Sequence, residues 1–230
     1  MATTLPQLVI FDCDGVLVDS EPISNGVLAR LLNEEGLAIS SEEATREFKG
    51  MLMRDVVDKA QAMLGRPVPD DFTARFEAVR AKEFEAHLQP VAGARAAVEA
   101  VREAGIAACV ASQGKLEKTN MTLTLCGLRD LFADDELFSA YSVARGKPHP
   151  DLFLHAAETM GAAPDDCLVV EDTTLGVRAA LSAAMPVLWY FDGRTPLDGL
   201  AHVPRLESLD ELAPRLGLST TPGGFASPTP

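Results

Sequence analysis

The chain has 230 residues, of which 47% are hydrophobic and 23% are charged, and its formal net charge at pH 7 is −14. This composition is typical of a globular protein with a substantial core, and the length suits one large domain or a core with a small insert. The negative charge and the lack of any basic run exclude a nucleic-acid-binding surface, because phosphate neutralisation needs clustered lysine or arginine.

Compartment and assembly follow from features that the sequence lacks. No apolar run reaches the roughly 20 residues that span a membrane, and residues 1–7 lack the basic and apolar regions of a signal peptide. The four cysteines show no paired spacing, which is typical of buried thiols in a reducing compartment. We therefore expect a cytoplasmic protein without a membrane partner, present as a monomer or weak dimer. Residues 219–230 are rich in proline, glycine, serine and threonine, and we expect a flexible tail there.

The first predicted element is a strand over 8–12, LVIFD, which ends on the carboxylate of Asp12. Asp14 follows two residues after Asp12, and Gly15 comes directly after it. Two carboxylates this close raise each other's pKa unless a positive charge lies between them. The stretch therefore predicts a bound cation, an anionic substrate held by that cation, or both.

Residues 20–88 contain no convincing strand. The helical patterns in this segment cover 21–36, 40–50, 53–65 and 70–88. Ser40, with Glu43 three residues later, is typical of a capping box. A helical segment between the first two strands is an insert, and it emerges at the carboxyl edge of the sheet, where open α/β sheets bind ligands. We predict that this insert is a cap over a site, with Glu21 and Lys49 as its substrate contacts.

After the insert, short apolar runs alternate with amphipathic helices. Continuous apolarity in the runs is typical of strands buried on both faces of a parallel sheet. The predicted strands cover 106–112, 137–141, 167–172 and 187–191. The predicted helices next to them cover 93–105, 115–127 and 150–161. This alternation predicts a doubly wound α/β core made of residues 1–19 and 89–218.

Polar residues gather at the ends of the predicted strands or in the loops after them. Ser112 ends the second strand, Lys147 comes just before a helix, and Glu171 and Asp172 end the fourth strand. In a parallel sheet these ends meet at one edge. With the two aspartates after the first strand they bring together four carboxylates, a hydroxyl and a lysine. Carboxylate oxygens at that density favour a hard divalent cation, Mg²⁺ in particular.

The same residues match the requirements of phosphoryl transfer. That reaction needs an in-line nucleophile, neutralised charge on the phosphoryl oxygens and a proton donor for the leaving oxygen. Asp12 is the candidate nucleophile and also a metal ligand, and Asp14 is the candidate general acid and base. Ser112 is placed to donate to a phosphoryl oxygen, and Lys147 supplies a fixed positive charge. The paired acids that end the fourth strand complete the predicted metal shell.

Four segments together resemble the motifs of the haloacid dehalogenase superfamily. In chain order they are FDCDGVLVDSE, VASQG, GKPHPD and VVEDTTLGVRAA. The likeness extends from Leu8 to about Pro214 and is greatest to the branch that has a helical cap and contains phosphatases and β-phosphoglucomutases. The resemblance implies a Rossmann-like core with a parallel sheet in the strand order 3-2-1-4-5.

The resemblance also implies roles for individual residues. Asp12 would be the nucleophile, Asp14 the acid and base, and Ser112 and Lys147 the phosphate-binding residues. The implied Mg²⁺ ligands are Asp12, Asp14 through its backbone carbonyl, Glu171 and Asp172. The chain departs from the family pattern at Gln113, where relatives often carry asparagine or serine, and we expect Gln113 to contact the substrate.

These features predict a Mg²⁺-dependent phosphatase of a small phosphorylated metabolite, with a sugar phosphate as the expected class. A phosphomutase of the β-phosphoglucomutase type is the alternative, because it would share the aspartyl-phosphate. Those mutases resemble one another in a hinge threonine and a nearby histidine, where this chain has Ser20 and Ser24, so hydrolysis is favoured. A noncatalytic phospho-ligand sensor is disfavoured because no catalytic position is lost, and a dehalogenase because that reaction leaves Asp14 without a task.

Overall fold

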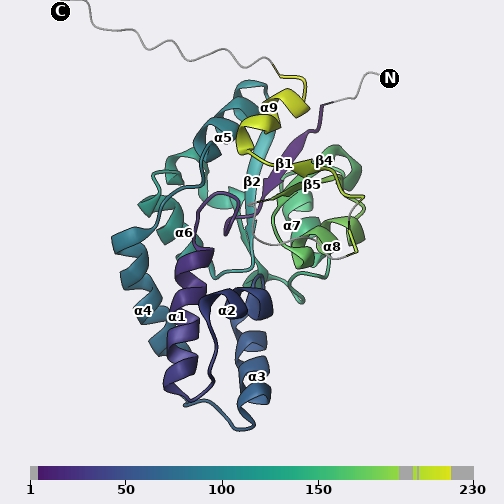
Figure 1. Cartoon of the computed structure of the whole chain (residues 1–230). Coiled ribbons are helices and arrows are strands. Elements are labelled where there is room, and N and C mark those ends of the chain that lie inside the picture. The colour runs from purple at the N-terminus through teal and green to yellow at the C-terminus, as the bar shows by residue number, and fades with distance from the viewer. Residues whose placement is uncertain (1–4, 192–198, 201, 219–230) are drawn as a thin grey trace, which may run out of the picture.

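The computed structural model describes residues 5–191, 199–200 and 202–218 (Figure 1). The predicted tail over 219–230 lies outside them. Within the described residues, no helix has the length and apolarity needed to cross a membrane.

The core is one parallel sheet in the order β3-β2-β1-β4-β5-β6. Its strands are β1 (Leu8–Phe11), β2 (Ala107–Ser112), β3 (Leu137–Ser139), β4 (Cys167–Glu171), β5 (Val187–Tyr190) and β6 (Arg205–Leu206). The predicted order 3-2-1-4-5 is confirmed. The sequence prediction missed β6, because a strand of two residues is too short to show a hydrophobic pattern.

Helices cover both faces of the sheet, as a doubly wound fold requires (Figure 1). They are α5 (Ala94–Glu103), α6 (Leu116–Leu125), α7 (Asp151–Thr159), α8 (Thr174–Ser182) and α9 (Leu212–Arg215). Side chains alternate across a strand, so Val9 and Phe11 pack with α5, α6 and α9, while Leu8 and Ile10 pack with α7 and α8. All four side chains of β1 are fully buried, which explains the continuous apolar run in the sequence.

Four further helices follow β1 and lie together at one end of the molecule, outside the sheet (Figure 1). They are α1 (Glu21–Glu34), α2 (Ser41–Phe48), α3 (Met53–Leu64) and α4 (Phe72–His87). Their apolar faces form a separate cluster that includes Leu32 and Phe72. The predicted capping box at the start of α2 is confirmed, because Ser40 Oγ accepts from the Glu43 amide at 3.1 Å and Glu43 Oε2 accepts from the Ser40 amide at 2.8 Å.

The chain leaves the sheet and returns to it through two neighbouring segments. The Asp19 amide donates to the Gln89 carbonyl at 2.9 Å, and the Val91 amide donates to the Leu17 carbonyl at 3.0 Å. This pairing brings the start of α1 and the end of α4 to the carboxyl edge of the sheet. The four helices therefore stand next to the strand ends that carry the polar residues.

Candidate active site

The register of the sheet brings the predicted site residues together. Phe11 is the partner of Val110 in β2 and of Val170 in β4. The residues that follow these positions, Asp12, Ser112 and Glu171, therefore emerge at one edge. The Asp12 amide still donates to the Val170 carbonyl at 3.0 Å, so the backbone that carries its carboxylate is held by the sheet.

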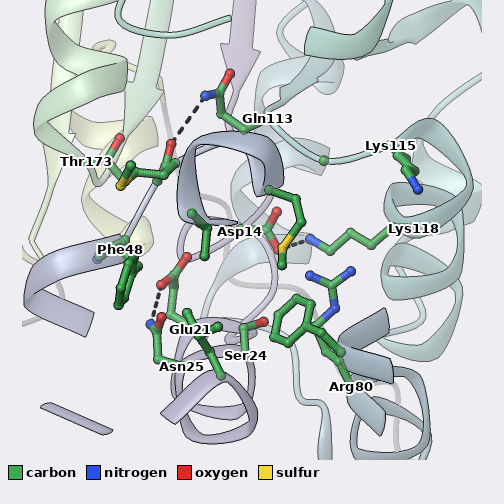
Figure 2. Close-up of a pocket in the computed structure, with 18 of the residues that line it drawn as sticks. Asp14, Glu21, Ser24, Asn25, Phe48, Arg80, Gln113, Lys115, Lys118 and Thr173 are labelled. Carbon is green, nitrogen blue, oxygen red and sulfur yellow. Dashed lines mark hydrogen bonds and ion pairs between the residues drawn. The ribbon is translucent and has the colours of Figure 1, made fainter. Parts of the chain in front are cut away.

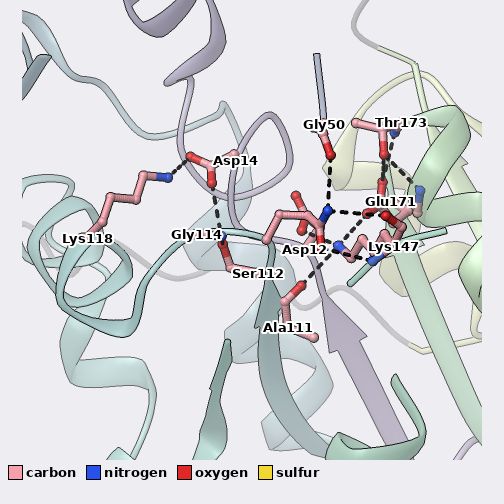
Figure 3. A network of polar contacts seen from close by, with 12 residues as sticks. Asp12, Asp14, Gly50, Ala111, Ser112, Gly114, Lys118, Lys147, Glu171 and Thr173 are labelled. Atoms are coloured by element: carbon pink, nitrogen blue, oxygen red, sulfur yellow. Dashed lines mark hydrogen bonds and ion pairs between the residues drawn. The ribbon is translucent and has the colours of Figure 1, made fainter. Parts of the chain in front are cut away.

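Lys147 lies at the centre of the site and bridges two carboxylates (Figure 3). Its Nζ is 2.5 Å from Asp12 Oδ1 and 2.5 Å from Glu171 Oε1, and it donates to the Ala111 carbonyl at 3.1 Å. Burial raises the pKa of Asp12 to about 7 even though the Lys147 charge opposes the shift. Burial by itself would lower the pKa of Lys147, but the charges of Asp12 and Glu171 outweigh it and raise that pKa.

Three carboxylates form a group that fits a divalent cation. Asp12, Glu171 and Asp172 each present an oxygen within 4.8 Å of the others, and all three residues are buried. Oδ1 of Asp172 is buried without a hydrogen-bond partner in the described part of the chain. Burial raises the pKa of Asp172 well above its usual range. Buried, mutually repelling oxygens of this kind are a donor set that Mg²⁺ accepts.

Two features near Asp172 bear on the predicted metal ligands. Lys49 Nζ lies 2.7 Å from Asp172 Oδ2, so this residue, which we expected to contact the substrate, contacts a predicted metal ligand. Gly15 adopts φ +83°, and a Cβ there would lie 2.2 Å from Asp172 Oδ2. Only glycine allows the turn after β1 to approach that carboxylate so closely.

The carboxylate of Asp14 is outside this group and has different partners. It contacts Lys118 Nζ and Ser20 Oγ closely, and Ser112 Oγ lies 3.4 Å from its Oδ2. Burial alone would raise the pKa of Asp14, but the Lys118 charge and the hydrogen bonds from Lys118 and Ser20 lower it below the usual range. The sequence analysis missed Lys118. The available signal was its place one helical turn after Lys115, in a helix that begins just beyond Ser112.

Gln113 ties two loops together. Its Oε1 accepts from the Lys147 amide at 3.0 Å, and its Nε2 donates to the Gly50 carbonyl at 3.3 Å. Both ends of the Gln113 amide therefore have protein partners, and the contact of Gln113 with substrate stays a prediction. On the opposite side, Glu21 accepts from Asn25 Nδ2 at 2.8 Å, and burial raises the pKa of Glu21.

A cavity of about 320 Å³ lies between the sheet edge and helices α1–α4 (Figure 2). Its size is in the range of small-molecule sites. The predicted site residues that line it are Asp12, Asp14, Glu21, Lys49, Gln113, Lys147 and Glu171. The sequence analysis missed Arg80, which lines the cavity from α4. No sequence signal could have found Arg80, because the orientation of α4 depends on packing.

The model of the haloacid dehalogenase-like hydrolase family matches residues 6–184. The chain belongs to this family. The resemblance that the four sequence motifs suggested is thereby confirmed, and the chain is a hydrolase by family. The parallel strand order is that of solved structures from the same family.

Several relatives of this haloacid dehalogenase-like hydrolase have described activities. The 6-phosphogluconate phosphatase of Escherichia coli (strain K12) is 30% identical over 185 residues, which cover 80% of this chain and 82% of that protein. Hexitol phosphatase A of the same organism is 31% identical over 204 residues and covers 87% of each chain. A family hydrolase from Deinococcus radiodurans R1, solved with bound phosphate and sodium, superposes with a TM-score of 0.75 at 30% identity and covers 95% of this chain and 99% of that one.

Proposed function

We propose that this hydrolase is a Mg²⁺-dependent phosphatase that removes phosphate from a small sugar phosphate through an aspartyl-phosphate on Asp12. The observation that carries the proposal is the buried contact of Asp12 with Lys147, beside two further carboxylates at the same sheet edge. The phosphatase relatives support the class of reaction, phosphoric monoester hydrolysis, and of substrate.

Asp12 is the proposed nucleophile because it opens to the cavity while Lys147 holds one of its oxygens. Attack of the other oxygen on phosphorus forms a P–O bond to Asp12 and breaks the P–O bond to the sugar. The Lys147 charge stays next to the phosphoryl oxygens during the transfer. Ser112, at the end of β2, is proposed to donate its hydroxyl to one of them.

Asp14 is the proposed acid and base. It protonates the leaving sugar oxygen and then takes a proton from the water that attacks the aspartyl-phosphate. In the present geometry its partners are Lys118, Ser20 and Ser112. Because these contacts lower its pKa, substrate binding has to turn Asp14 away from Lys118 before it can carry a proton.

The proposed metal ligands are the carboxylates of Asp12, Glu171 and Asp172 and the backbone carbonyl of Asp14. Bound Mg²⁺ would neutralise charge on the transferring phosphoryl group. Thr173 orients Glu171 by donating from its amide at 2.8 Å and its hydroxyl at 3.0 Å. Asp172 Oδ1, which is buried without a hydrogen-bond partner among the described residues, supports a cation at this position.

Residues 20–88, which contain helices α1–α4, are proposed to form a cap that excludes water and contacts the sugar. The loop after α2 supports this role, since Lys49 and Gly50 reach Asp172 and Gln113 in the core. The mutase alternative shares every step up to the aspartyl-phosphate. Of the two residues that the mutases share, the hinge threonine has a hydroxyl counterpart in Ser20. The histidine has no counterpart, because Ser24 stands at that position and supplies no imidazole.

The test of this function is Asp12→Asn. The variant should form no aspartyl-phosphate and should lose at least about 1000-fold in turnover, measured as phosphate released from a panel of sugar phosphates with Mg²⁺. Near-normal turnover would rule out the covalent mechanism. In the wild type, rapid conversion of β-glucose 1-phosphate to glucose 6-phosphate with little free phosphate, given a trace of the 1,6-bisphosphate, would instead establish the mutase.

A further inference from the structure

Arg80 lies on α4, and its guanidinium points into the cavity beside Lys118 and Asp14 (Figure 2). Among the residues that the structure describes, this guanidinium has no hydrogen-bond or ion-pair partner, and Arg80 is half-buried. It lies over two aromatic rings, with centroids 4.7 Å away for Phe76 and 5.7 Å away for Phe84. The rings hold the planar group in place through cation–π contact and leave its N–H donors directed elsewhere.

The other cations that line the cavity are already paired with carboxylates. The pairs are Lys147 with Asp12 and Glu171, Lys118 with Asp14, Lys115 with Glu77, and Lys49 with Asp172. Arg80 is therefore the one lysine or arginine among the described lining residues whose charge has no carboxylate partner.

An unpaired charge in this position is unfavourable for the protein alone. Burial lowers the pKa of Arg80, and the charge of Asp14 opposes that shift only in part. Withdrawing a charge from water costs free energy unless a counter-charge or hydrogen bonds replace the water. A ligand that brings an anionic group to this wall of the cavity would supply both.

We propose that Arg80 binds a carboxylate of the substrate on the α4 side of the cavity. This inference rests on the proposed function and narrows its substrate class to phosphorylated sugar acids or shorter hydroxy acids. The α4 wall that carries Arg80 is separate from the sheet wall that carries Asp12. The guanidinium fork matches a carboxylate with two parallel hydrogen bonds. A second phosphate, with nearly twice the charge, would call for more than this one unpaired cation.

The test compares two substrates that share one carbon chain and a 6-phosphate. 6-Phosphogluconate ends in a carboxylate, and glucitol 6-phosphate ends in a hydroxyl. We expect Arg80→Gln to lower kcat/KM for the acid by roughly 10- to 100-fold, mainly through KM, because a charge-assisted pair is lost. The fall for glucitol 6-phosphate should stay below about threefold, and Arg80→Lys should recover part of the loss.

Lys82→Gln is the matched control, since Lys82 lies on the same helix, is exposed to solvent and carries the same charge. It should change kcat/KM for both substrates equally and by less than about twofold. Thermal unfolding of each variant checks the fold. If Arg80→Gln does not fold, Arg80→Lys carries the test through a rise in KM confined to the acid.

Equal losses for both substrates would overturn the inference, because Arg80 would then act on Asp14 or the phosphoryl group. Unchanged kinetics would overturn it too. Fructose 1,6-bisphosphate is the third substrate, and a loss confined to it would reject the carboxylate in favour of a second phosphate. Phosphate release from glucitol 6-phosphate by the wild type tests the proposed phosphatase function separately from the proposed role of Arg80. If the wild type hydrolyses none of these compounds, the proposed function fails, whereas hydrolysis that ignores Arg80 defeats the inference alone.

Discussion

At the scale of single residues, the site buries three carboxylates against one another and compensates them with lysines. Asp12, Glu171 and Asp172 form the group, while Lys147 and Lys49 supply the positive charge. Burial raises the pKa of Asp12 and of Asp172. The two lysine charges oppose this shift, but they are too few to reverse it beside three carboxylates. The protein alone therefore favours a proton where a metal ion would otherwise bind.

This charge arrangement predicts how Mg²⁺ affinity depends on pH. Below the Asp12 pKa of about 7 the carboxyl is protonated, and Mg²⁺ must displace that proton. The apparent Mg²⁺ dissociation constant should fall by up to about tenfold per pH unit as the pH rises towards 7, and Asp172, whose pKa is also raised, should add to this dependence. Calorimetric titration in buffers of different ionisation enthalpy measures both the affinity and the released proton.

Stability provides an independent check on the same pKa. The folded pKa of Asp12 is above its ordinary value of 3.8, so its contribution to stability is present below about pH 4 and is lost as the pH rises to about 7. Added Mg²⁺ should restore that loss above pH 7. Asp172→Ala should weaken Mg²⁺ binding at every pH, and an affinity that is flat from pH 6 to 8 would contradict the assignment of Asp12.

At the scale of elements, the first turn of α8 fixes Glu171 by close approach. The α8 N-cap, Thr173, accepts from the Gly176 amide at 3.0 Å and donates to Glu171. A Cβ on Gly176 would lie 1.8 Å from Glu171 Oε1. The helix and the end of β4 can be this close only because that position carries no side chain.

Gly176→Ala should therefore displace Glu171 from Thr173 and Lys147. We expect Mg²⁺ affinity to fall at least about tenfold and unfolding free energy to fall by about 1–3 kcal/mol. Urea unfolding and a Mg²⁺ titration measure the two effects.

Gly26→Ala in α1 is the matched control. Its new Cβ would meet only Ser41 Oγ at 3.9 Å, so helix propensity should add up to about 1 kcal/mol of stability. Glycine-to-alanine effects of the same sign at both positions would contradict the steric explanation.

At the scale of the whole molecule, the proposed cap meets the core mainly through α1, α4 and the loop after α2. In that loop, Lys49 contacts Asp172 and Gly50 contacts Gln113. These are polar contacts, and most apolar side chains of α1–α4 form a cluster of their own, although Phe84 and Leu52 join the clusters on the sheet faces. Two bodies with largely separate cores, joined mostly by a few polar contacts, are expected to move relative to each other.

Spin labels can test this movement. Met63 on α3 and Leu181 on α8 are each 42% exposed, and labels there, in a background where native Cys126 is replaced by serine, report the distance between the two parts. We expect a broad distribution in the free protein and a narrow one with Mg²⁺ and vanadate. A label pair at Leu125 and Leu181, both on helices that cover the sheet, should not respond. One narrow distribution in both states would exclude a mobile cap.

The sequence by itself determined the strands of the parallel sheet, their order along the chain and the residues at the strand ends, while the strand order within the sheet came from the resemblance to the family. Local pattern carries that information, because a strand buried on both faces is a continuous apolar run, and the polar residue that ends it, such as Asp12 or Ser112, must lie at the carboxyl edge. The helices of residues 20–88 were readable for the same reason, since periodicity and the Ser40 capping box are local.

Only the tertiary structure decided the partners of these residues. The ion pairs of Lys118 with Asp14 and of Lys49 with Asp172 depend on how α6 and the loop after α2 pack against the sheet edge. The position of Arg80 depends in the same way on the packing of α4. Helix packing angles are set by side chains distant in sequence, and no periodicity in one helix encodes them. The two-residue β6 could not be predicted from the sequence, because it has no hydrophobic pattern of its own. It is a strand only through its pairing with β5.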